Sequence, residues 1–315
     1  MVTASSATGA PPLEVIVFPG GFNWPLFVAE AKGFFAQEGI GVNLTPTPDS
    51  QYQMVGFIDG KFDIAMTAID NVIAYAEGQG AAPTEKAPDI VAVMGMDNGF
   101  LRLVSVPEVT SIAELKDRQV GVDALTTGYA FALREMLERG GLDPAQFEYV
   151  RAGGVLKRFE ALMNREFAAT LLVSPFEAAA AREGFHVLGN ATDALGAYQG
   201  VVGAVRRDWI AGNEARLIGY IRACRSALAW LHDPANKEEA IAILQAAVPA
   251  MAPAVAAASH AILLDPRLGF FRTPRIDEAG VAKVLELRVK YAEPAKALSD
   301  PTKYYDTRFV EAALK

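Results

Sequence analysis

The stretch VIVFPGGFNWPLFVAEAKGFFAQEGIGVNL, residues 15–44, contains one complete strand–helix–strand unit. A β-rich run ends at Gly20 and Gly21, and Pro25 suits the first turn of a helix. Apolar residues then recur at helical spacing until Gly39, a natural residue to follow a helix end, and a second strand comes next. Such a unit predicts parallel strands with a helix packed across them.

The same alternation continues along the chain. The pattern predicts further strands at 62–66, 87–96, 100–106, within 111–123, and at 147–150, 168–173, 185–188 and 198–205. It predicts further helices at 52–58, 71–77, 128–139, 155–164, 175–182, 277–292, 307–314 and through most of 214–263.

Two α/β sets followed by helices predict an α/β protein of two Rossmann-like lobes joined by a hinge. We expect a flexible leader at 1–12, a first lobe that begins at 13–104, a second lobe at 105–199, and a helical tail at 200–315 that packs back on the first lobe. The hinge segments would then lie near Val104–Pro107 and near Gly200.

Composition excludes several classes of protein. A net charge of −8 over 315 residues argues against binding to nucleic acid, which needs a basic patch. The single cysteine, Cys224, rules out an intrachain disulfide and a cysteine-rich metal site, and its Ala/Leu surroundings predict an inert, packed thiol. There is no apolar run of membrane-spanning length and no signal-peptide pattern before the fold. The leader could be the remainder of an exported precursor or an added end.

Motifs of catalysis are missing from the sequence. His186, His232 and His260 are too scattered for a metal site, and H-E-x-x-H, G-x-S-x-G and the P-loop pattern do not occur. We therefore expect no catalytic residue, no metal and no cofactor, and favour a function other than catalysis.

The joints between strands and helices are the best candidates for a ligand site. In open α/β sheets, ligands bind at the carboxyl ends of strands, and a helix N-terminus there attracts an anion. Capping-box patterns occur at Thr67–Asp70, Ser111–Glu114 and Ser174–Glu177. Thr67 and Ser174 follow strands and so fit these joints, although a purely structural role stays open for both. Ser111 is expected only to open a helix. The candidate ligand-binding residues are Gly21, Phe22, Trp24, Gln51, Tyr52, Thr67, Asp70, Thr126, Thr127, Gly128, Tyr129, Ser174 and Phe176.

Glycines at these joints allow close approach, and the aromatics would form an apolar wall for a ligand. Arg102 and Arg151 are the cations nearest the joints, and either could bind a carboxylate or sulfonate or else be salt-bridged or solvated. Other aromatics fall on helix or strand faces and are expected in the core: Phe34, Phe35, Phe57 and Phe62.

Several stretches together carry a family resemblance: AEAKGFFAQEGIGVNL, GKFDIAMTAIDNVIAY, SIAELKDRQVGVDALTTGYAFALREMLERGGLDPAQFEYV, AWLHDPANKEEAIAIL and LSDPTKYYDTRFVEAAL. In this order they resemble the periplasmic solute-binding proteins of the NitT/TauT group of ABC importers, the NMT1/THI5-like type II binding proteins. The resemblance covers most of residues 13–315.

This resemblance implies two lobes that close about a hinge on a small-molecule ligand, and delivery of that ligand to an ABC permease and ATPase complex. It implies a monomer in the periplasm, or one lipid-anchored outside the inner membrane. Carried over by position, the family's ligand residues fall at Gly21–Asn23, 50–52, Thr67–Asp70, Thr126–Gly128 and near Ser174, which adds Asn23 to the candidates. Because the joints here are unusually aromatic, we expect an organic sulfonate or carboxylate, aromatic in character, rather than nitrate.

Enzymes on the same fold are the main alternative. A pyrimidine-precursor synthase would need a lysine for pyridoxal phosphate and a histidine in the cleft, yet Lys61 is the only lysine near a first-lobe joint and no histidine precedes His186. A menaquinone-pathway enzyme is a second possibility, and a ligand-sensing module, normally fused to a membrane or output domain, is a third.

Overall fold

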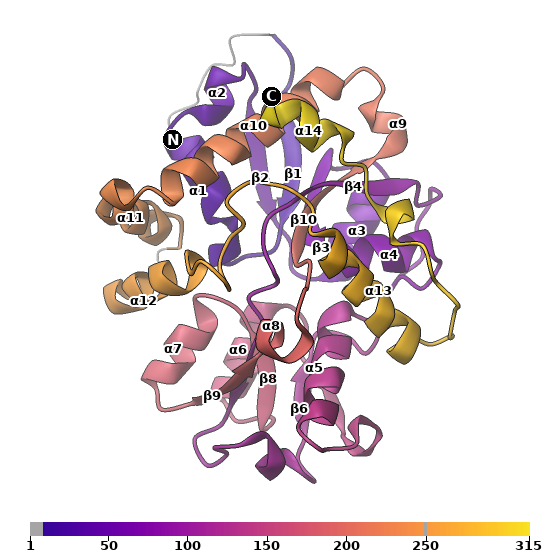
Figure 1. The fold of residues 1–315 in the computed structure, drawn as a ribbon, viewed down its shortest axis with the longest axis vertical. Coiled ribbons are helices and arrows are strands. Elements are labelled where there is room, and N and C mark those ends of the chain that lie inside the picture. Colours follow the sequence, from indigo (N-terminus) through magenta and orange to yellow (C-terminus); the bar gives the residue numbers. More distant parts are fainter. Residues whose placement is uncertain (1–8, 249–250) are drawn as a thin grey trace.

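The computed structural model describes residues 9–248 and 251–315, so the first eight residues of the expected leader lie outside the described part. The chain forms two α/β lobes, one above the other in Figure 1, and each is built on a five-stranded sheet. The predicted α/β fold with two lobes is therefore confirmed.

The sheet of the first lobe has the strand order β2-β1-β3-β10-β4. Its strands are β1 (Leu13–Val17), β2 (Val42–Pro46), β3 (Ile64–Ala68), β4 (Ile90–Gly95) and β10 (Val201–Arg206). As the strand–helix–strand pattern predicts, β1 runs parallel to β2 and β3. The sheet is nevertheless mixed, because β10 returns from the other lobe and pairs antiparallel with both β3 and β4.

The sheet of the second lobe has the order β7-β6-β8-β5-β9. Its strands are β5 (Arg102–Ser105), β6 (Val120–Val122), β7 (Tyr149–Arg151), β8 (Ala169–Leu172) and β9 (His186–Asn190). β6 is parallel to β7 and β8, whereas β5, which enters from the first lobe, is antiparallel to β8 and β9. In each lobe, a strand that arrives by crossing between the lobes runs against its neighbours.

Helices lie between successive strands along the chain. In the first lobe they are α1 (Trp24–Ala31), α2 (Phe34–Gln37), α3 (Ser50–Ile58) and α4 (Ile69–Ala76), and in the second α5 (Gly128–Arg139), α6 (Val155–Met163), α7 (Phe176–Arg182) and α8 (Ala191–Leu195). The single helix predicted before Gly39 is in fact two, because Gly33 adopts a left-handed conformation with φ 70° between α1 and α2. At Ser111 the predicted helix is only a 3-10 turn (Ile112–Leu115).

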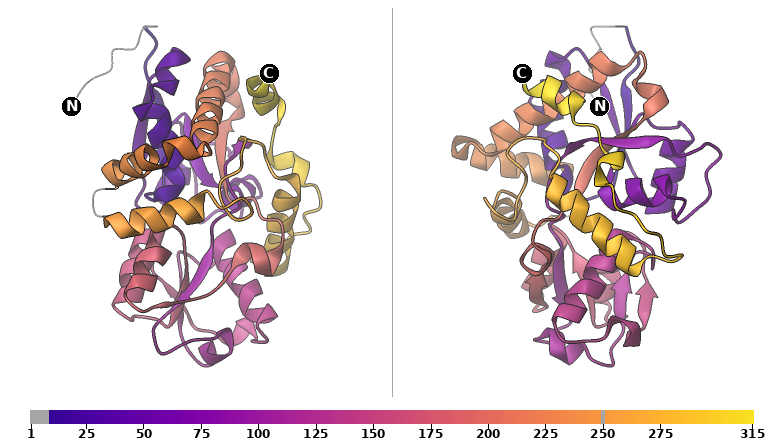
Figure 2. Two further views of the ribbon diagram at one scale, coloured as in Figure 1. Left: turned by 60° about the vertical axis from the view of Figure 1, so that its left-hand side comes forward. Right: turned by 45° about the vertical axis from the view of Figure 1, so that its right-hand side comes forward.

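The rest of the chain is a helical tail. It comprises α9 (Arg207–Ile210), α10 (Glu214–Leu231), α11 (Lys237–Ala247), α12 (Pro253–Leu263), α13 (Glu278–Tyr291) and α14 (Arg308–Leu314). α10 packs on α1 and α14 in the first lobe, as predicted for the tail. α13 instead packs on both α4 and α5, and Figure 2 shows it along the boundary between the lobes.

Two segments cross between the lobes, and Asp97 joins them. Asp97 Oδ1 accepts hydrogen bonds from the amides of Gly99 (2.8 Å) and Val201 (3.1 Å), and its carbonyl accepts one from Gly200 N (2.9 Å). Burial raises the pKa of Asp97 to about 7. The first crossing lies between β4 and β5, so the boundary expected at 104/105 cuts through β5, all of which pairs in the second sheet.

Both sheets are enclosed by apolar side chains. Of the four aromatics expected in the core, Phe35, Phe57 and Phe62 are buried and Phe34 is half-buried against the core. Throughout the described ranges, the helices are too short or too polar to serve as a membrane span.

Candidate functional site

A cavity lies between the two lobes at the carboxyl ends of their parallel strands. It measures about 60 Å³, room for a few water molecules. Its lining is mostly apolar with a few polar and charged groups, the usual composition of a small-molecule site. The lining residues are Phe18, Phe22, Met66, Thr67, Ala68, Asp70, Asn71, Asp123, Thr127, Gly128, Tyr129, Gly154, Val155, Arg158, Val173 and Val201.

Glycines at two strand–helix joints, Gly21 and Gly128, lie where the lobes are in direct contact. Gly21 N, after β1, donates to the carbonyl of Ser174 in the second lobe at 3.0 Å. A Cβ atom on Gly128, at the start of α5, would lie 2.5 Å from Cβ of Asp70, at the start of α4. Only a glycine therefore fits at position 128 in this arrangement.

Three helices begin at the cavity. Ile69–Ala76 (α4), Gly128–Arg139 (α5) and Val155–Met163 (α6) each have lining residues in or next to their first turn. Because the first amides of a helix have no partner within the helix and its dipole is positive there, these ends favour a negatively charged group.

Arg158 on α6 is the buried cation of the cavity. Its side chain donates to the carbonyl of Gly153 at 2.8 Å and to that of Leu171 at 3.3 and 3.4 Å. No carboxylate lies within 4 Å of it among residues 9–248 and 251–315, although Arg158 is only 3% exposed. Burial lowers the pKa of Arg158, and Asp123 and Tyr129 offset part of that effect. Of its five N–H donors, one on each terminal nitrogen remains for a ligand.

Asp70 is neutralised by a partner from the tail. Arg288 on α13 forms a two-pronged ion pair with it, through Nε to Oδ1 at 2.7 Å and Nη2 to Oδ2 at 2.6 Å. The same Nη2 donates to the carbonyl of Thr126 in the second lobe at 3.0 Å. Arg288 therefore joins the tail, the first lobe and the second lobe beside the cavity.

Asp123 and Tyr129 complete the polar part of the lining. Asp123 follows β6, and its Oδ1 accepts a hydrogen bond from the hydroxyl of Thr127. Tyr129, in the first turn of α5, has a raised pKa because burial and then the charge of Asp97 disfavour the phenolate. Tyr129 is therefore neutral at physiological pH and can donate or accept a hydrogen bond.

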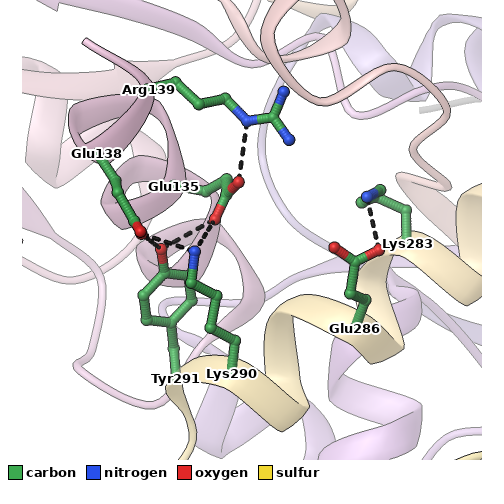
Figure 3. A network of polar contacts seen from close by, with 7 residues as sticks. All are labelled: Glu135, Glu138, Arg139, Lys283, Glu286, Lys290 and Tyr291. Carbon is green, nitrogen blue, oxygen red and sulfur yellow. Dashed lines mark hydrogen bonds and ion pairs between the residues drawn. The ribbon is translucent and has the colours of Figure 1, made fainter. Parts of the chain in front are cut away.

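A second bridge between the lobes lies at the end of α13. Lys290 Nζ bonds to Glu135 (2.8 Å) and Glu138 (2.6 Å) on α5, and the hydroxyl of Tyr291 bonds to the same two carboxylates. Figure 3 shows Lys290 and Tyr291 pointing at this pair of glutamates. Burial alone would raise the pKa of Glu135, but hydrogen bonds from Lys290, Arg139 and Tyr291 outweigh it and lower that pKa to about 2.

The structure brings six of the predicted site residues into the lining: Phe22, Thr67, Asp70, Thr127, Gly128 and Tyr129. Four more adjoin it. Gly21 and Ser174 hydrogen-bond to one another, Asn23 donates to the carbonyl of Phe18, and Thr126 accepts from Arg288.

The other four predicted residues lie away from the cavity. Trp24 is fully buried and donates to the carbonyl of Ala240 at 3.0 Å, so it packs α1 against the tail. Tyr52 and Gln51 are exposed at the start of α3, where they bond to Lys61 and to the carbonyl of Ala81. Phe176 packs on Phe159, with ring centroids 5.4 Å apart.

None of the three predicted capping boxes forms as predicted. Thr67 accepts a hydrogen bond from Asn71, and Asp70 is committed to Arg288 rather than to the helix start. At Ser111, Glu114 bonds to the amide of Thr110 instead. At the third box, Pro175 precedes the first residue of α7, and the hydroxyl of Ser174 donates to the carboxylate of Glu177 instead of accepting from a helix amide.

Neither of the two arginines considered from the sequence lines the cavity. Arg102 is buried in β5 outside the lining, and Arg151 is exposed. The missed residue, Arg158, shares an apolar helix face with Val155 and Leu162, and a charge on such a face was the signal that could have found it.

The residues that suit the alternative enzymes lie elsewhere. Lys61 is exposed, and neither it nor any histidine of the described ranges lines the cavity. No group of three potential metal ligands occurs among those residues. Cys224 is buried, and burial raises the pKa of its thiol, which agrees with the inert thiol expected.

Comparison with known sequences finds a family. A sequence model described as NMT1/THI5 like matches residues 23–237. A protein of Bacillus subtilis (strain 168) named YtlA is 40% identical over 60 residues, which make up 19% of this chain and only 18% of that protein.

Solved structures share the fold. A protein from Bordetella bronchiseptica RB50 is 18% identical, with a TM-score of 0.79 over 96% of this chain and 97% of that one. The ligand-binding component of an ABC-type import system from Staphylococcus aureus, with zinc bound, is 14% identical, with a TM-score of 0.75 over 96% and 99%. The periplasmic aliphatic sulphonate binding protein SsuA from Escherichia coli is 18% identical, with a TM-score of 0.70 over 95% and 93%.

An enzyme shares the fold as well. The desulfurization enzyme DSZB is 14% identical, with a TM-score of 0.65 over 96% of this chain and 99% of that one. At such identities the likeness shows the fold alone, so function has to be argued from the site.

Proposed function

The chain belongs to the NMT1/THI5-like family, and from that premise we propose that it is the solute-binding protein of an ABC importer. Its ligand is a small organic anion, a sulfonate or a carboxylate with an aromatic or apolar body, captured between the lobes. The protein acts as a monomer in the periplasm or anchored outside the inner membrane, and it delivers the ligand to a permease and ATPase complex.

The observation that carries the proposal is Arg158. The guanidinium of Arg158 is 3% exposed and has no carboxylate within 4 Å in the described ranges. Burying such a charge costs free energy of folding unless a negatively charged group of a ligand pairs with it. The two remaining donors of Arg158 match the two oxygens of a carboxylate or sulfonate, and the starts of α4, α5 and α6 add favourable dipoles. Phe18, Phe22 and Tyr129 supply apolar surface for the body of the ligand.

Capture would proceed by closure of the lobes about the two crossing segments. In the arrangement described, Gly21 meets Ser174, and Gly128 meets Asp70 across the cavity mouth. These contacts have to separate to admit a ligand and form again to enclose it. Binding energy from the ligand would then favour the closed form over the open one.

The alternative function is that of an enzyme, because the desulfurization enzyme DSZB has the same fold. A turnover assay with chorismate-derived substrates and pyrimidine precursors separates the two. Product formed in proportion to protein concentration would favour the enzyme, and binding without turnover favours the solute-binding protein.

A thermal-shift panel tests the proposal. It contains taurine and alkyl sulfonates, benzoate-type and phenylpropanoid carboxylates, pyrimidine precursors, nitrate and bicarbonate. A ligand at 100 times its Kd adds about 2.7 kcal/mol to the free energy of unfolding, which is several degrees in Tm. We expect organic sulfonates or carboxylates to give the shift, and a response to inorganic anions alone would contradict the proposed ligand class. Native mass spectrometry beforehand detects ligand trapped during expression.

A further inference from the structure

The cavity contains two opposite charges that do not pair with one another. Arg158 and Asp123 both line it, yet no ion pair within 4 Å joins them or links either one to another described residue. The two charges are nevertheless close enough to interact. Burial lowers the pKa of Arg158, and the negative charge of Asp123 offsets part of that effect. Both also line a second, smaller cavity of about 10 Å³ behind Tyr129.

The remaining charge of the lining is already balanced. Asp70 is bound through both oxygens by Arg288, which is fully buried. Asp123 has no such cation, and its one recorded hydrogen bond within the described ranges comes from the hydroxyl of Thr127 to Oδ1. Its other oxygen therefore remains as an acceptor without a donor from the described part of the chain.

The charges of Arg158 and Asp123 restrict the kind of ligand that the cavity can bind. A ligand with only a negative group on Arg158 would leave Asp123 without a positive partner and would be repelled by its charge. A ligand with only a positive group on Asp123 would meet the same problem at Arg158. A ligand with both groups neutralises each partner.

From this arrangement we infer that the ligand is zwitterionic, a small amino acid with an apolar or aromatic body. Its acidic group bonds to Arg158 and its ammonium group bonds to Asp123. The body lies against Phe22 and Tyr129. This inference rests on the proposed function and narrows its ligand class.

Two matched series test it by isothermal titration calorimetry. One series is phenylalanine, 3-phenylpropanoate and 2-phenylethylamine, and the other is leucine, 4-methylpentanoate and 3-methylbutylamine. In at least one series we expect the zwitterion to bind with a Kd about tenfold or more below that of its anion and of its amine, as expected for a hydrogen bond between charged groups.

Asp123→Asn provides the decisive comparison, because it removes the negative charge and keeps the shape. The ratio between zwitterion and anion should fall to about one, while the anion binds at least as well as before, which also shows that the variant is folded. Glu166→Gln is the matched control, because it removes an exposed carboxylate of the same lobe that is outside the lining. It should leave the ratio unchanged.

The failures are distinguishable. If the anions bind as tightly as the zwitterions, or if Asp123→Asn leaves the ratio unaltered, the inference is overturned while the proposed function stands. If no member of either series binds and the wider panel of organic acids gives no thermal shift, the proposed function and the inference both fail.

Discussion

Arg158 is the residue that points most directly to a ligand site. Its helix positions it among Val155, Ala161 and Leu162, where a neutral side chain would pack without the cost of removing a guanidinium from water. Backbone carbonyls accept hydrogen bonds from three of its donors, the other two have no partner among the described residues, and the side chain lines the cavity. A buried charge satisfied only in part is a good candidate for a functional residue.

We expect Arg158→Gln to raise the Kd for an organic acid about 10- to 100-fold, because a charged hydrogen bond is worth about 1.5–3 kcal/mol. Calorimetry on the variant and on the wild-type protein measures the change. Arg151→Gln is the matched control, because Arg151 is an exposed cation of the same lobe outside the lining. Equal losses in both variants would mean that overall charge, rather than a contact at Arg158, governs binding.

At the residue scale, the sequence indicates which strand–helix joints surround the cavity, but not which side chains at those joints line it. The cavity lies at the ends of β1, β3 and β6 that the sequence indicated, because strand-end geometry follows from the pattern of elements. The sequence could not tell that Trp24 points into the core while Phe22 lines the cavity, since two positions along a tight turn differ only in direction. That direction is fixed by tertiary packing, here by α11, which accepts the indole hydrogen bond.

Among the elements, the starts of α4 and α5 approach one another closely beside the cavity. Their contact depends on Gly128, because a Cβ there would lie 2.5 Å from Cβ and 2.7 Å from Cγ of Asp70. Such a distance cannot be accommodated without moving one helix.

Gly128→Ala should therefore weaken ligand binding at least tenfold by holding the lobes apart, with little effect on the Tm of the ligand-free protein. Calorimetry and thermal unfolding together measure both effects. Gly189→Ala serves as the control, because its Cβ would meet only Met136 Cε at an ordinary 3.8 Å. Undiminished affinity in Gly128→Ala would show that this contact does not take part in closure.

The elements themselves were largely predictable. The boundaries of α5 match the prediction, because Gly128 and the apolar spacing after it define a helix without help from the rest of the chain. The antiparallel direction of β5 and β10 could not be predicted, because it follows from the crossing between lobes rather than from any local pattern.

The network between α5 and α13 predicts an acid sensitivity. Since the pKa of Glu135 is lowered to about 2, its contribution to stability is present above the unfolded value of about 4.3 and is lost as the pH falls toward 2. The free energy of unfolding, measured with urea from pH 6 to pH 2.5, should therefore fall more steeply in the wild-type protein than in Glu135→Gln. Glu166→Gln should follow the wild-type curve, and parallel curves for all three would rule out this contribution.

For the whole molecule, contacts of several kinds connect the lobes, among them the crossing segments joined by Asp97, the contacts beside the cavity, and α13. The first allows rotation with few broken bonds, because the hydrogen bonds of Asp97 lie within the crossing segments themselves. The second and third oppose opening. Arg288 bonds to both lobes beside the cavity, and Lys290 and Tyr291 bond to α5 further along the boundary.

The central claim is that the lobes close on a ligand held between them, and small-angle X-ray scattering tests it most directly. The purified chain is measured alone and with a saturating amount of the organic acid that stabilises it most, with binding established by calorimetry. We predict a smaller radius of gyration with the ligand, and a liganded curve that matches the two-lobe arrangement described above. Identical curves with and without a bound ligand would contradict the account.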